Sequence, residues 1–515
     1  MNGAECLLKT LVNGGVDVCF TNPGTSEMHF VAAVDRVEGM RCILGLFEGV
    51  VSGAADGYAR MTDKPAVTLL HLGPGLANGL ANFHNARKAN VPIISVVGEH
   101  ATYHRECDPP LHSDISAFAK TVSGWVECVE SPDQIPVATH AAIQASLTPP
   151  GQIATLILPA DCTWEESNPP STEPIVSPVY QKVSDEVIKA AATALRTGKQ
   201  TAILLGGRVL RQKGLNLAGK IAAKCNARLF CDTINARLER GAGLTPVFSL
   251  PYFAEKTVEI LTGLDHLVIV GTKPPVSFFA YPDVPNRLTP SGCETHMLAR
   301  PEQDCLEALE RLVDEIDATN EIPRVLDLKP MGLPTGELNP QSIGQSVATL
   351  LPEHCIVIDE GISSTLPLSA ITATAMPHDW LGIAGGSIGG GMPLATGAAV
   401  ACPDRKVLCL EADGSGMYTL QALWTQARES LDVTTVIFAN RAYRILAMEH
   451  QRIGAGDPGP KAHDIMSLDR PELDWVSLAT GLGVPARRVT SAEEFNQCLE
   501  AFLKEPGPNL IEAII

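Results

Sequence analysis

Residues 406–440, KVLCLEADGSGMYTLQALWTQARESLDVTTVIFAN, hold two apolar runs with a helical pattern between them. The runs KVLCLEAD and VTTVIFAN predict buried strands, and TLQALWTQARES predicts the helix that connects them. Apolar strands separated by helices are typical of a parallel sheet covered on both faces. Such sheets bind ligands at the carboxyl ends of their strands, which here are closed by Asp413 and Asn440. The stretch therefore predicts an α/β fold with a polar site at one sheet edge.

The same alternation extends along the whole chain. Buried strands are predicted at PAVTLLHL, VPIISVVGE and IATLILPAD in the first third, at QTAILLGG, RLFCDT and DHLVIVGTK in the middle, and at HCIVIDEG ahead of the opening stretch. Two Pro-, Ser- and Thr-rich segments, 166–178 and 317–340, have the composition of linkers. We therefore expect three doubly wound parallel-sheet domains, with limits near 1–165, 180–316 and 340–515.

Composition argues against several classes of protein. A chain of 515 residues with 45% hydrophobic content is long enough for several packed cores. The net charge of -19 disfavours a nucleic-acid partner, because phosphate neutralisation needs clustered Lys and Arg. No apolar run reaches the roughly 18 residues that span a bilayer. The start MNGAECLLKTLVNGG also lacks a signal-peptide pattern, so we expect no membrane partner and a cytoplasmic protein.

Two other kinds of site are disfavoured. The 14 cysteines form no CxxC pair and are expected to be buried free thiols. A zinc site could be drawn from one loop, but the polar run DPPLHSD gives it no framework; its four members would be His100, His104, Cys107 and His112. A nicotinamide dehydrogenase is disfavoured because no G-x-G-x-x-G opens a helix with an acidic partner downstream.

Asp413 and Asn440 close neighbouring strands of the predicted crossover. Carboxylate and amide oxygens suit a hard cation such as Mg²⁺. The helix predicted to open after Gly414 and Ser415 would aim unpaired N–H groups at a phosphate in the same place. The alternative is that both residues are ordinary turn formers or caps.

The stretch ADGSGMYTLQALWTQARESLDVTTVIFANRAY resembles the G-D-G-S…N signature of thiamine diphosphate enzymes. The resemblance implies that Mg²⁺ is held by Asp413, Asn440 and the carbonyl of Ala442, and that the diphosphate is held by Gly414, Ser415 and Gly416. The signature's first glycine is Ala412 here. Alanine can adopt extended backbone, so we expect the site to keep both metal and cofactor.

Three further segments agree with this resemblance. GLFEGVVSGAADGYAR resembles the pyrimidine-domain segment, which implies that Glu48 is the catalytic carboxylate; taken alone, it would be a helix N-terminal glutamate. GGSIGGGMPLATGAA implies that Gly386 offers its carbonyl to the aminopyrimidine and that Ile388 bends the cofactor. DEGISSTLPL implies diphosphate contacts from Ser363 and Ser364, with a solvated Ser-rich loop as the alternative.

Two branches of the family are similar to this chain. CFTNPGTSEMHF and GPKAHDIMSLDRPELDWVSLATGLGVPA are similar to acetolactate synthase large-subunit-like chains. However, YHRECDPPLHSDI and NRAYRILAMEHQR depart from the Phe-Gln loop and Gln-Trp-Gln run of biosynthetic acetolactate synthases, so FAD is not expected. In the benzoylformate decarboxylase branch, Thr25 matches a substrate-contacting serine and His71 matches one catalytic histidine. PPVSFFAYPDVP lacks the second histidine.

The substrate pocket is expected just after the metal-binding asparagine. The positions implied by the resemblance are Ile445, Leu446 and Glu449, which share one helical face. The alternative for Glu449 is a surface position beside two core residues. An inward Glu449 would favour a substrate with a hydroxyl or amine over a purely aromatic one.

The resemblance implies a thiamine diphosphate- and Mg²⁺-dependent 2-oxo acid decarboxylase that forms an enamine intermediate. Capture of that enamine by a second carbonyl, which would give carboligase activity, is left open. The alternatives are an acetolactate synthase-like carboligase and a thiamine diphosphate-binding regulatory protein without catalysis. Because the family builds its site from two subunits, a homodimer is the expected minimum and a homotetramer the expected assembly. The substrate's identity, the choice between dimer and tetramer and the role of the central domain stay open.

Overall fold

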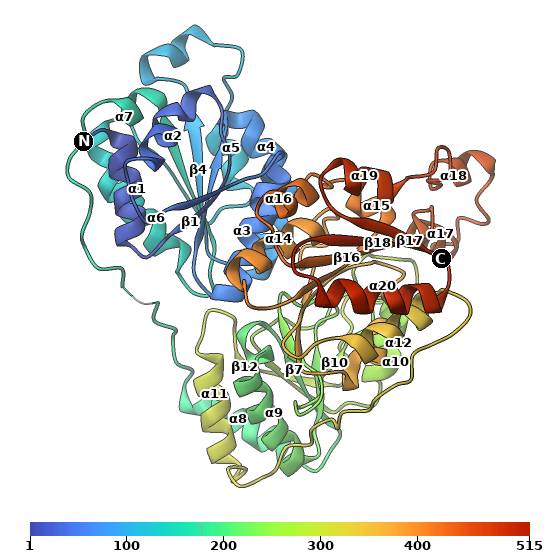
Figure 1. Ribbon diagram of the computed structural model, residues 1–515. Coiled ribbons are helices and arrows are strands. Elements are labelled where there is room, and N and C mark those ends of the chain that lie inside the picture. Colours follow the sequence, from blue (N-terminus) through green and yellow to red (C-terminus); the bar gives the residue numbers. More distant parts are fainter. Residues whose placement is uncertain (177) are drawn as a thin grey trace.

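The computed structural model describes residues 1–176 and 178–515. It contains three α/β domains, each built around its own sheet (Figure 1). This confirms the predicted fold class of three parallel-sheet domains. Among the described helices, none is both long and apolar enough to cross a bilayer. All 14 cysteines are free; half of them are buried and only Cys107 is exposed.

The first domain has a six-stranded parallel sheet in the order β2-β1-β3-β4-β6-β5. Alternate residues of its strands enter two different cores, one on each face. Strand β2 lies on one side of β1, and the next strand in the chain, β3, lies on the other side. The ligand-binding crevice is therefore expected between the carboxyl ends of β1 and β3. Its elements are α1 (Gly3–Asn13), β1 (Val18–Asn22), η1 (Thr25–Glu27), α2 (Met28–Val34), β2 (Arg41–Leu44), α3 (Glu48–Thr62), β3 (Ala66–Leu70), α4 (Leu72–Ala89), β4 (Ile93–Glu99), η2 (Thr102–Cys107), α5 (Ile115–Lys120), β5 (Trp125–Cys128), η3 (Pro132–Gln134), α6 (Ile135–Ser146), β6 (Ile153–Pro159) and α7 (Ala160–Trp164).

The central domain has a five-stranded parallel sheet in the order β10-β8-β7-β11-β12. It lies below the other two domains in Figure 1. Its elements, including one strand that leaves for another sheet, are α8 (Asp185–Leu195), β7 (Thr201–Leu205), η4 (Gly207–Leu210), α9 (Gln212–Cys225), β8 (Arg228–Cys231), β9 (Leu238–Arg240), β10 (Phe248–Ser249), α10 (Ala254–Leu261), β11 (His266–Val270), β12 (Glu294–Ala299) and α11 (Cys305–Glu315).

The third domain has a seven-stranded sheet in the order β17-β18-β16-β15-β13-β14-β9. All its neighbours are parallel except β9, which crosses over from the central segment and pairs antiparallel with β14. Strand β14 lies on one side of β13, and the next strand in the chain, β15, lies on the other side. This change of direction puts the crevice between the carboxyl ends of β13 and β15. Its elements are α12 (Pro340–Leu350), β13 (Ile356–Glu360), α13 (Leu368–Ile371), η5 (Thr372–Thr374), β14 (His378–Gly382), α14 (Gly391–Ala401), β15 (Val407–Ala412), α15 (Asp413–Gly416), α16 (Ala422–Arg428), β16 (Val433–Ala439), α17 (Arg444–Arg452), α18 (Pro460–Asp464), α19 (Trp475–Gly481), β17 (Ala486–Val489), α20 (Ala492–Lys504) and β18 (Asn509–Ile514).

One predicted helix is interrupted. The helix predicted for TLQALWTQARES would begin at Thr419, but residues 417–421 form a turn and α16 begins only at Ala422. The turn lets the Thr419 hydroxyl donate to the carbonyl of Gly389 at 2.9 Å. The prediction was wrong at this point because a tertiary hydrogen bond competes with the helical pattern.

Helices α3 and α14 join the first and third domains through small residues. A Cβ on Gly57 would lie 2.1 Å from the Leu394 carbonyl oxygen, and one on Gly397 would lie 1.9 Å from the Ala54 carbonyl oxygen. These glycines let the two helix backbones touch. One apolar core therefore runs from the first sheet across both helices into the third. We keep 1–165, 180–316 and 340–515 as the proposed domain limits.

Candidate functional site

Asp413 and the loop after Asn440 meet at the carboxyl edge of the third sheet. They follow the parallel neighbours β15 and β16. Asp413 Oδ2 accepts a hydrogen bond from the Arg441 N–H at 2.6 Å, and Asn440 Oδ1 accepts one from the Ala442 N–H at 3.0 Å. Burial raises the pKa of Asp413 to about 6. The three residues expected to hold Mg²⁺ thus lie at the adjoining ends of β15 and β16, and oxygen ligands around a buried carboxylate fit that cation.

The alanine in the signature does not distort this edge. Ala412 has φ -84° and ψ 148°, which is extended backbone that alanine adopts freely. Glycine is needed two residues later, because a Cβ on Gly414 would lie 2.6 Å from the Tyr443 ring. A Cβ on Gly416 would lie 2.8 Å from the Trp475 ring. The Ser415 hydroxyl donates to Glu411 Oε1 at 2.5 Å and is therefore directed into the domain.

The turn after β13 supplies a second group of polar atoms. It follows the strand next to β15, so Ser363 and Ser364 lie at the same crevice as Asp413. Ser364 is 1% exposed, and its Oγ is buried without a hydrogen-bond partner among the described residues. Ile362 has φ 49°, a strained conformation for a β-branched residue. A buried hydroxyl without a partner at a strained turn fits an anionic ligand such as a diphosphate.

The glycine-rich loop is fixed from two domains. Gly386 has φ 71°, is exposed, and faces the Phe278 ring, whose Cζ would lie 2.9 Å from an added Cβ. From α4, Asn82 donates to the Gly389 carbonyl at 3.1 Å and Asn85 donates to the Ser387 carbonyl at 2.8 Å. Ile388, between these two anchored positions, is half-buried. The backbone that is expected to carry the aminopyrimidine contact is therefore held rigidly.

Two buried glutamates that the sequence reasoning missed support this loop. Glu360 accepts from the Gly389 N–H at 2.7 Å and from the Gly391 N–H, and Glu411 accepts from the Ser415 hydroxyl at 2.5 Å. Burial raises the pKa of Glu360 to about 7, and burial together with the Glu360 charge raises that of Glu411. A charged residue inside an otherwise apolar strand, as in HCIVIDEG and KVLCLEADG, was the signal that could have found them.

Glu48 begins α3 and lies against the start of α4. Its Oε2 accepts a hydrogen bond from the Asn78 side chain at 3.0 Å. A Cβ on Gly75 would lie 3.3 Å from Glu48 Oε1 and 3.6 Å from His71 Cβ. Glu48 and His71 therefore flank the same glycine, and the structure brings these two predicted residues together. Helix α4 connects them to the glycine-rich loop, because its Asn82 bonds both the Gly49 and Gly389 carbonyls.

His71 is held by a buried glutamate that the sequence reasoning also missed. His71 Nδ1 lies 2.8 Å from Glu27 Oε2, which also accepts from the Gly24 N–H at 2.8 Å. The Glu27 side chain is 2% exposed and that of His71 is 25% exposed. Burial raises the pKa of Glu27, an effect that the neighbouring His71 opposes. The signal was the G-x-x-E spacing of a capping turn in GTSE.

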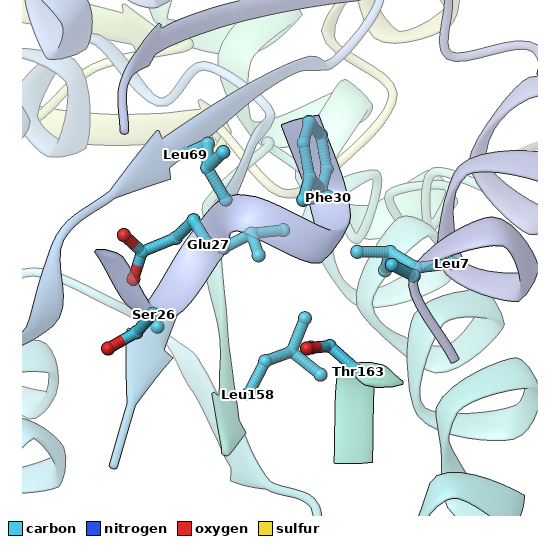
Figure 2. A pocket seen from close by; sticks show the side chains of 10 residues that line it. Leu7, Ser26, Glu27, Phe30, Leu69, Leu158 and Thr163 are labelled. Carbon is cyan, nitrogen blue, oxygen red and sulfur yellow. The ribbon is translucent and has the colours of Figure 1, made fainter. Parts of the chain in front are cut away.

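Figure 2 shows the apolar surroundings of Glu27, which include Leu69, Phe30 and Leu158. They enclose a cavity of about 10 Å³, the lower limit for one water molecule. Thr25 begins the same turn and is exposed at the crevice between β1 and β3. The crevice of the first sheet therefore presents one hydroxyl and one imidazole.

Glu449 points inward, toward the central domain. Its side chain is 14% exposed; it accepts from the Tyr281 hydroxyl, and from Arg452 at 2.6 Å. Ile445 is half-buried and Leu446 is 48% exposed, so neither of these two neighbours of Glu449 is a core residue. Tyr281 belongs to the same loop as Phe278, which faces Gly386. A histidine-free aromatic loop thus lies between the glycine-rich loop and α17.

The four residues of the possible loop zinc site do not converge. In residues 1–176 and 178–515, no set of three of them places ligand atoms around one point. His112 instead bonds Asp108 at 3.2 Å, and Cys107 is exposed.

Comparisons with known proteins agree with this geometry. Residues 1–121 match the model of the thiamine pyrophosphate enzyme N-terminal binding domain, and residues 365–513 match that of the C-terminal binding domain. IlvX of Mycobacterium tuberculosis, provisionally named as an acetolactate synthase large subunit, is 52% identical over 100% of this chain and 99% of its own. Benzoylformate decarboxylase of Pseudomonas aeruginosa is 28% identical over 97% and 96% of the two chains.

Among solved structures, the fold is similar to that of a thiamine diphosphate-dependent 4-hydroxybenzoylformate decarboxylase from Rhodococcus jostii. The TM-score is 0.86 at 24% identity, covering 99% of this chain and 98% of the other. Both cofactor-binding domains are matched, and one relative is similar over its full length. The chain therefore belongs to the family of thiamine pyrophosphate enzymes.

Proposed function

We propose that the protein is a Mg²⁺- and thiamine diphosphate-dependent decarboxylase of 2-oxo acids. The observation that carries the proposal is the Glu27–His71 pair beside Glu48. It gives the crevice a group that can deliver a proton to a carbanion, which is the step that ends a decarboxylation with an aldehyde.

The cofactor would lie between the crevice of the first sheet in one subunit and the crevice of the third sheet in another. Asp413, Asn440 and the Ala442 carbonyl would hold Mg²⁺, while the buried Ser364 hydroxyl, with Ser363 and the backbone of Gly414, Ser415 and Gly416, would face the diphosphate. When bound, thiamine diphosphate supplies a nucleophilic carbon and an acceptor for the electrons that CO₂ leaves behind. Gly386 would offer its carbonyl to the aminopyrimidine, and Ile388 would support the bend of the cofactor.

Glu48 would hold a proton at the pyrimidine ring. Its position at the first turn of α3, with Asn78 donating to one oxygen, fixes the carboxylate without neutralising it through a cation. By family resemblance, this carboxylate comes from one subunit and the metal edge from another. We therefore propose a homodimer as the minimum assembly and a homotetramer as the working form.

His71 would move the proton that completes the reaction. Because Glu27 Oε2 accepts at Nδ1, that nitrogen carries a proton and Nε2 is left to exchange one with substrate. Thr25 would contact the substrate carboxylate from the same edge.

The pocket favours a 2-oxo acid whose side chain is apolar near the 2-oxo group and carries a hydrogen-bonding group at its other end. Phe278 offers an aromatic ring beside Gly386, whereas Tyr281 and Glu449 offer polar atoms. Arg452 pairs with Glu449, so the pocket accepts a neutral hydroxyl or amide more readily than a second cation. Ile445 and Leu446 would line the remaining wall.

A second candidate is an acetolactate synthase-like carboligase. The 52% identity to IlvX favours it, since that relative is named for this reaction. The two candidates differ in what meets the activated substrate carbon, namely a proton from His71 or the carbonyl of a second 2-oxo acid.

The test is a panel of 2-oxo acids incubated with the Mg²⁺–thiamine diphosphate form, with and without an acceptor aldehyde. Aldehyde and CO₂ alone support the decarboxylase, and a hydroxy ketone from two 2-oxo acids supports the carboligase. Glu48→Gln should abolish turnover of every accepted substrate, while Glu38→Gln, at an exposed position, should leave it unchanged. Turnover that survives Glu48→Gln, or no turnover with any 2-oxo acid, would refute the proposal.

A further inference from the structure

The central domain carries two histidines and a glutamate at the amino-terminal ends of β11 and β12. His266 is paired in register with Glu294, and Val268 is paired with His296. Residues two apart in a strand point to the same face, so His266, Glu294 and His296 share one side of the sheet. The cluster therefore lies at the end of the sheet opposite to the carboxyl ends of strands β7, β8 and β11.

Three ligand atoms of this cluster surround a common point. His266 Nδ1 lies 3.2 Å from His296 Nε2, and Glu294 Oε2 lies 3.6 Å from the first nitrogen and 4.0 Å from the second. A triangle with these sides has a circumscribed radius of about 2.1 Å, which matches zinc–imidazole and zinc–carboxylate bonds of about 2.0–2.2 Å. The carboxylate oxygen is too far from either ring nitrogen for a good hydrogen bond. Its distances from the two nitrogens are nevertheless close to the distance between two ligand atoms bound to the same ion.

Burial and access also fit a metal site. The side chains of His266 and His296 are 10% and 14% exposed, and that of Glu294 is 68% exposed. The two imidazoles are therefore held in place by the sheet, while the glutamate leaves an entry from solvent.

We propose that His266, Glu294 and His296 bind a divalent transition-metal ion of the Zn²⁺ class, with water in the remaining coordination position. Imidazole ligands select such ions, whereas the oxygen-lined Asp413 edge selects Mg²⁺, so the two sites take different cations. The bound ion would clamp β12 to β11 at the point where the loop carrying Phe278 and Tyr281 rejoins the sheet. The site is independent of the proposed reaction.

The experiment uses tag-free protein that has been freed of metal and then saturated with Mg²⁺ and thiamine diphosphate. Titration with Zn²⁺ by calorimetry, and with Co²⁺ by visible absorption, should show one saturable site per chain with a Kd in the micromolar range or below. Loss of a residue that merely orients a ligand costs about 10–100-fold in metal affinity, so His296→Ala and Glu294→Gln should each cost at least about 100-fold.

Two variants distinguish loss of a metal ligand from a general loss of structure or of surface histidines. Glu294 is largely exposed, so Glu294→Gln removes a ligand without disturbing the core. The double variant His104→Ala/His112→Ala, in the loop that does not converge, should bind Zn²⁺ as the parent does. No saturable Zn²⁺ binding by the parent overturns the proposal. Unchanged Zn²⁺ affinity of Glu294→Gln or His296→Ala also overturns it. The proposal fails as well if only the double variant His104→Ala/His112→Ala loses Zn²⁺ binding.

Discussion

Replacing Arg60 by methionine tests how the three domains are held around the cofactor site. The Arg60 side chain is 1% exposed and forms a two-bond ion pair with the fully buried Asp56, at 2.7 and 2.6 Å. Its remaining nitrogen Nη1 donates to the carbonyls of Ala236 and Gly382, at 3.1 and 2.7 Å. Those carbonyls belong to the central segment and to the strand that precedes the glycine-rich loop, so one guanidinium joins all three parts of the chain.

The magnitude follows from what Arg60→Met leaves behind. Breaking a buried ion pair by removing one partner costs about 3–5 kcal/mol, because the other charge stays buried without compensation. The Ala236 and Gly382 carbonyls would each lose a donor, at a further cost of about 1–3 kcal/mol per buried group. We expect a loss of at least about 5 kcal/mol in unfolding free energy. The matched control Arg36→Met breaks an exposed pair with Glu5 and should cost less than about 1 kcal/mol.

The pH dependence of Arg60→Met has a defined sign. Burial already raises the pKa of Asp56 above 3.8, and Arg60 opposes that rise. Without Arg60 the pKa in the folded state climbs further, so the variant is least impaired below about pH 3.8 and loses stability as pH increases.

The assay is urea unfolding across pH, combined with a double-mutant cycle using Asp56→Asn. A coupling energy of about 3 kcal/mol or more is expected, together with weaker thiamine diphosphate binding, because Gly382 leads into the glycine-rich loop. A coupling energy below about 1 kcal/mol, or a loss for Arg60→Met that does not grow with pH, would refute the reasoning.

Three further predictions concern the crevice, the domain junction and the pocket. Burial raises the pKa of Glu27 above 4.5, so the parent should lose stability as pH rises from that value, and thermal unfolding of Glu27→Gln across pH should show a smaller loss. Gly397→Ala places a Cβ 1.9 Å from the Ala54 carbonyl oxygen and should cost about 3 kcal/mol in urea unfolding. Gly481→Ala, whose Cβ meets nothing, should cost little; equal losses would contradict the tight helix contact. Glu449→Leu should raise KM roughly tenfold or more for substrates with a polar far end, since a hydrogen bond to a charged group contributes about 1.5–3 kcal/mol; an equal change for apolar substrates would contradict the pocket assignment.

Much of the fold and part of the site could be predicted because their signals are local. The strand at 407–412 and the short helix at 413–416 follow from a short apolar run and a glycine pair. The Asp413 and Asn440 loops could be placed together because parallel neighbours end at the same edge. Glu27 and Glu360 escaped prediction because each acts on a distant segment, namely the His71 ring and the glycine-rich loop. Nothing in their own sequence surroundings shows those partners.

The sequence by itself determined the fold class, the cofactor family and the predicted residues at both crevices, since motif spacing and periodicity are properties of contiguous chain. Only the tertiary structure decided that Ala412 is extended, that Glu449 faces Tyr281 instead of solvent, and that His266, Glu294 and His296 surround one point. Each of these depends on packing between segments far apart in sequence. There, burial and the need to satisfy polar groups, not local propensity, fix where a side chain lies.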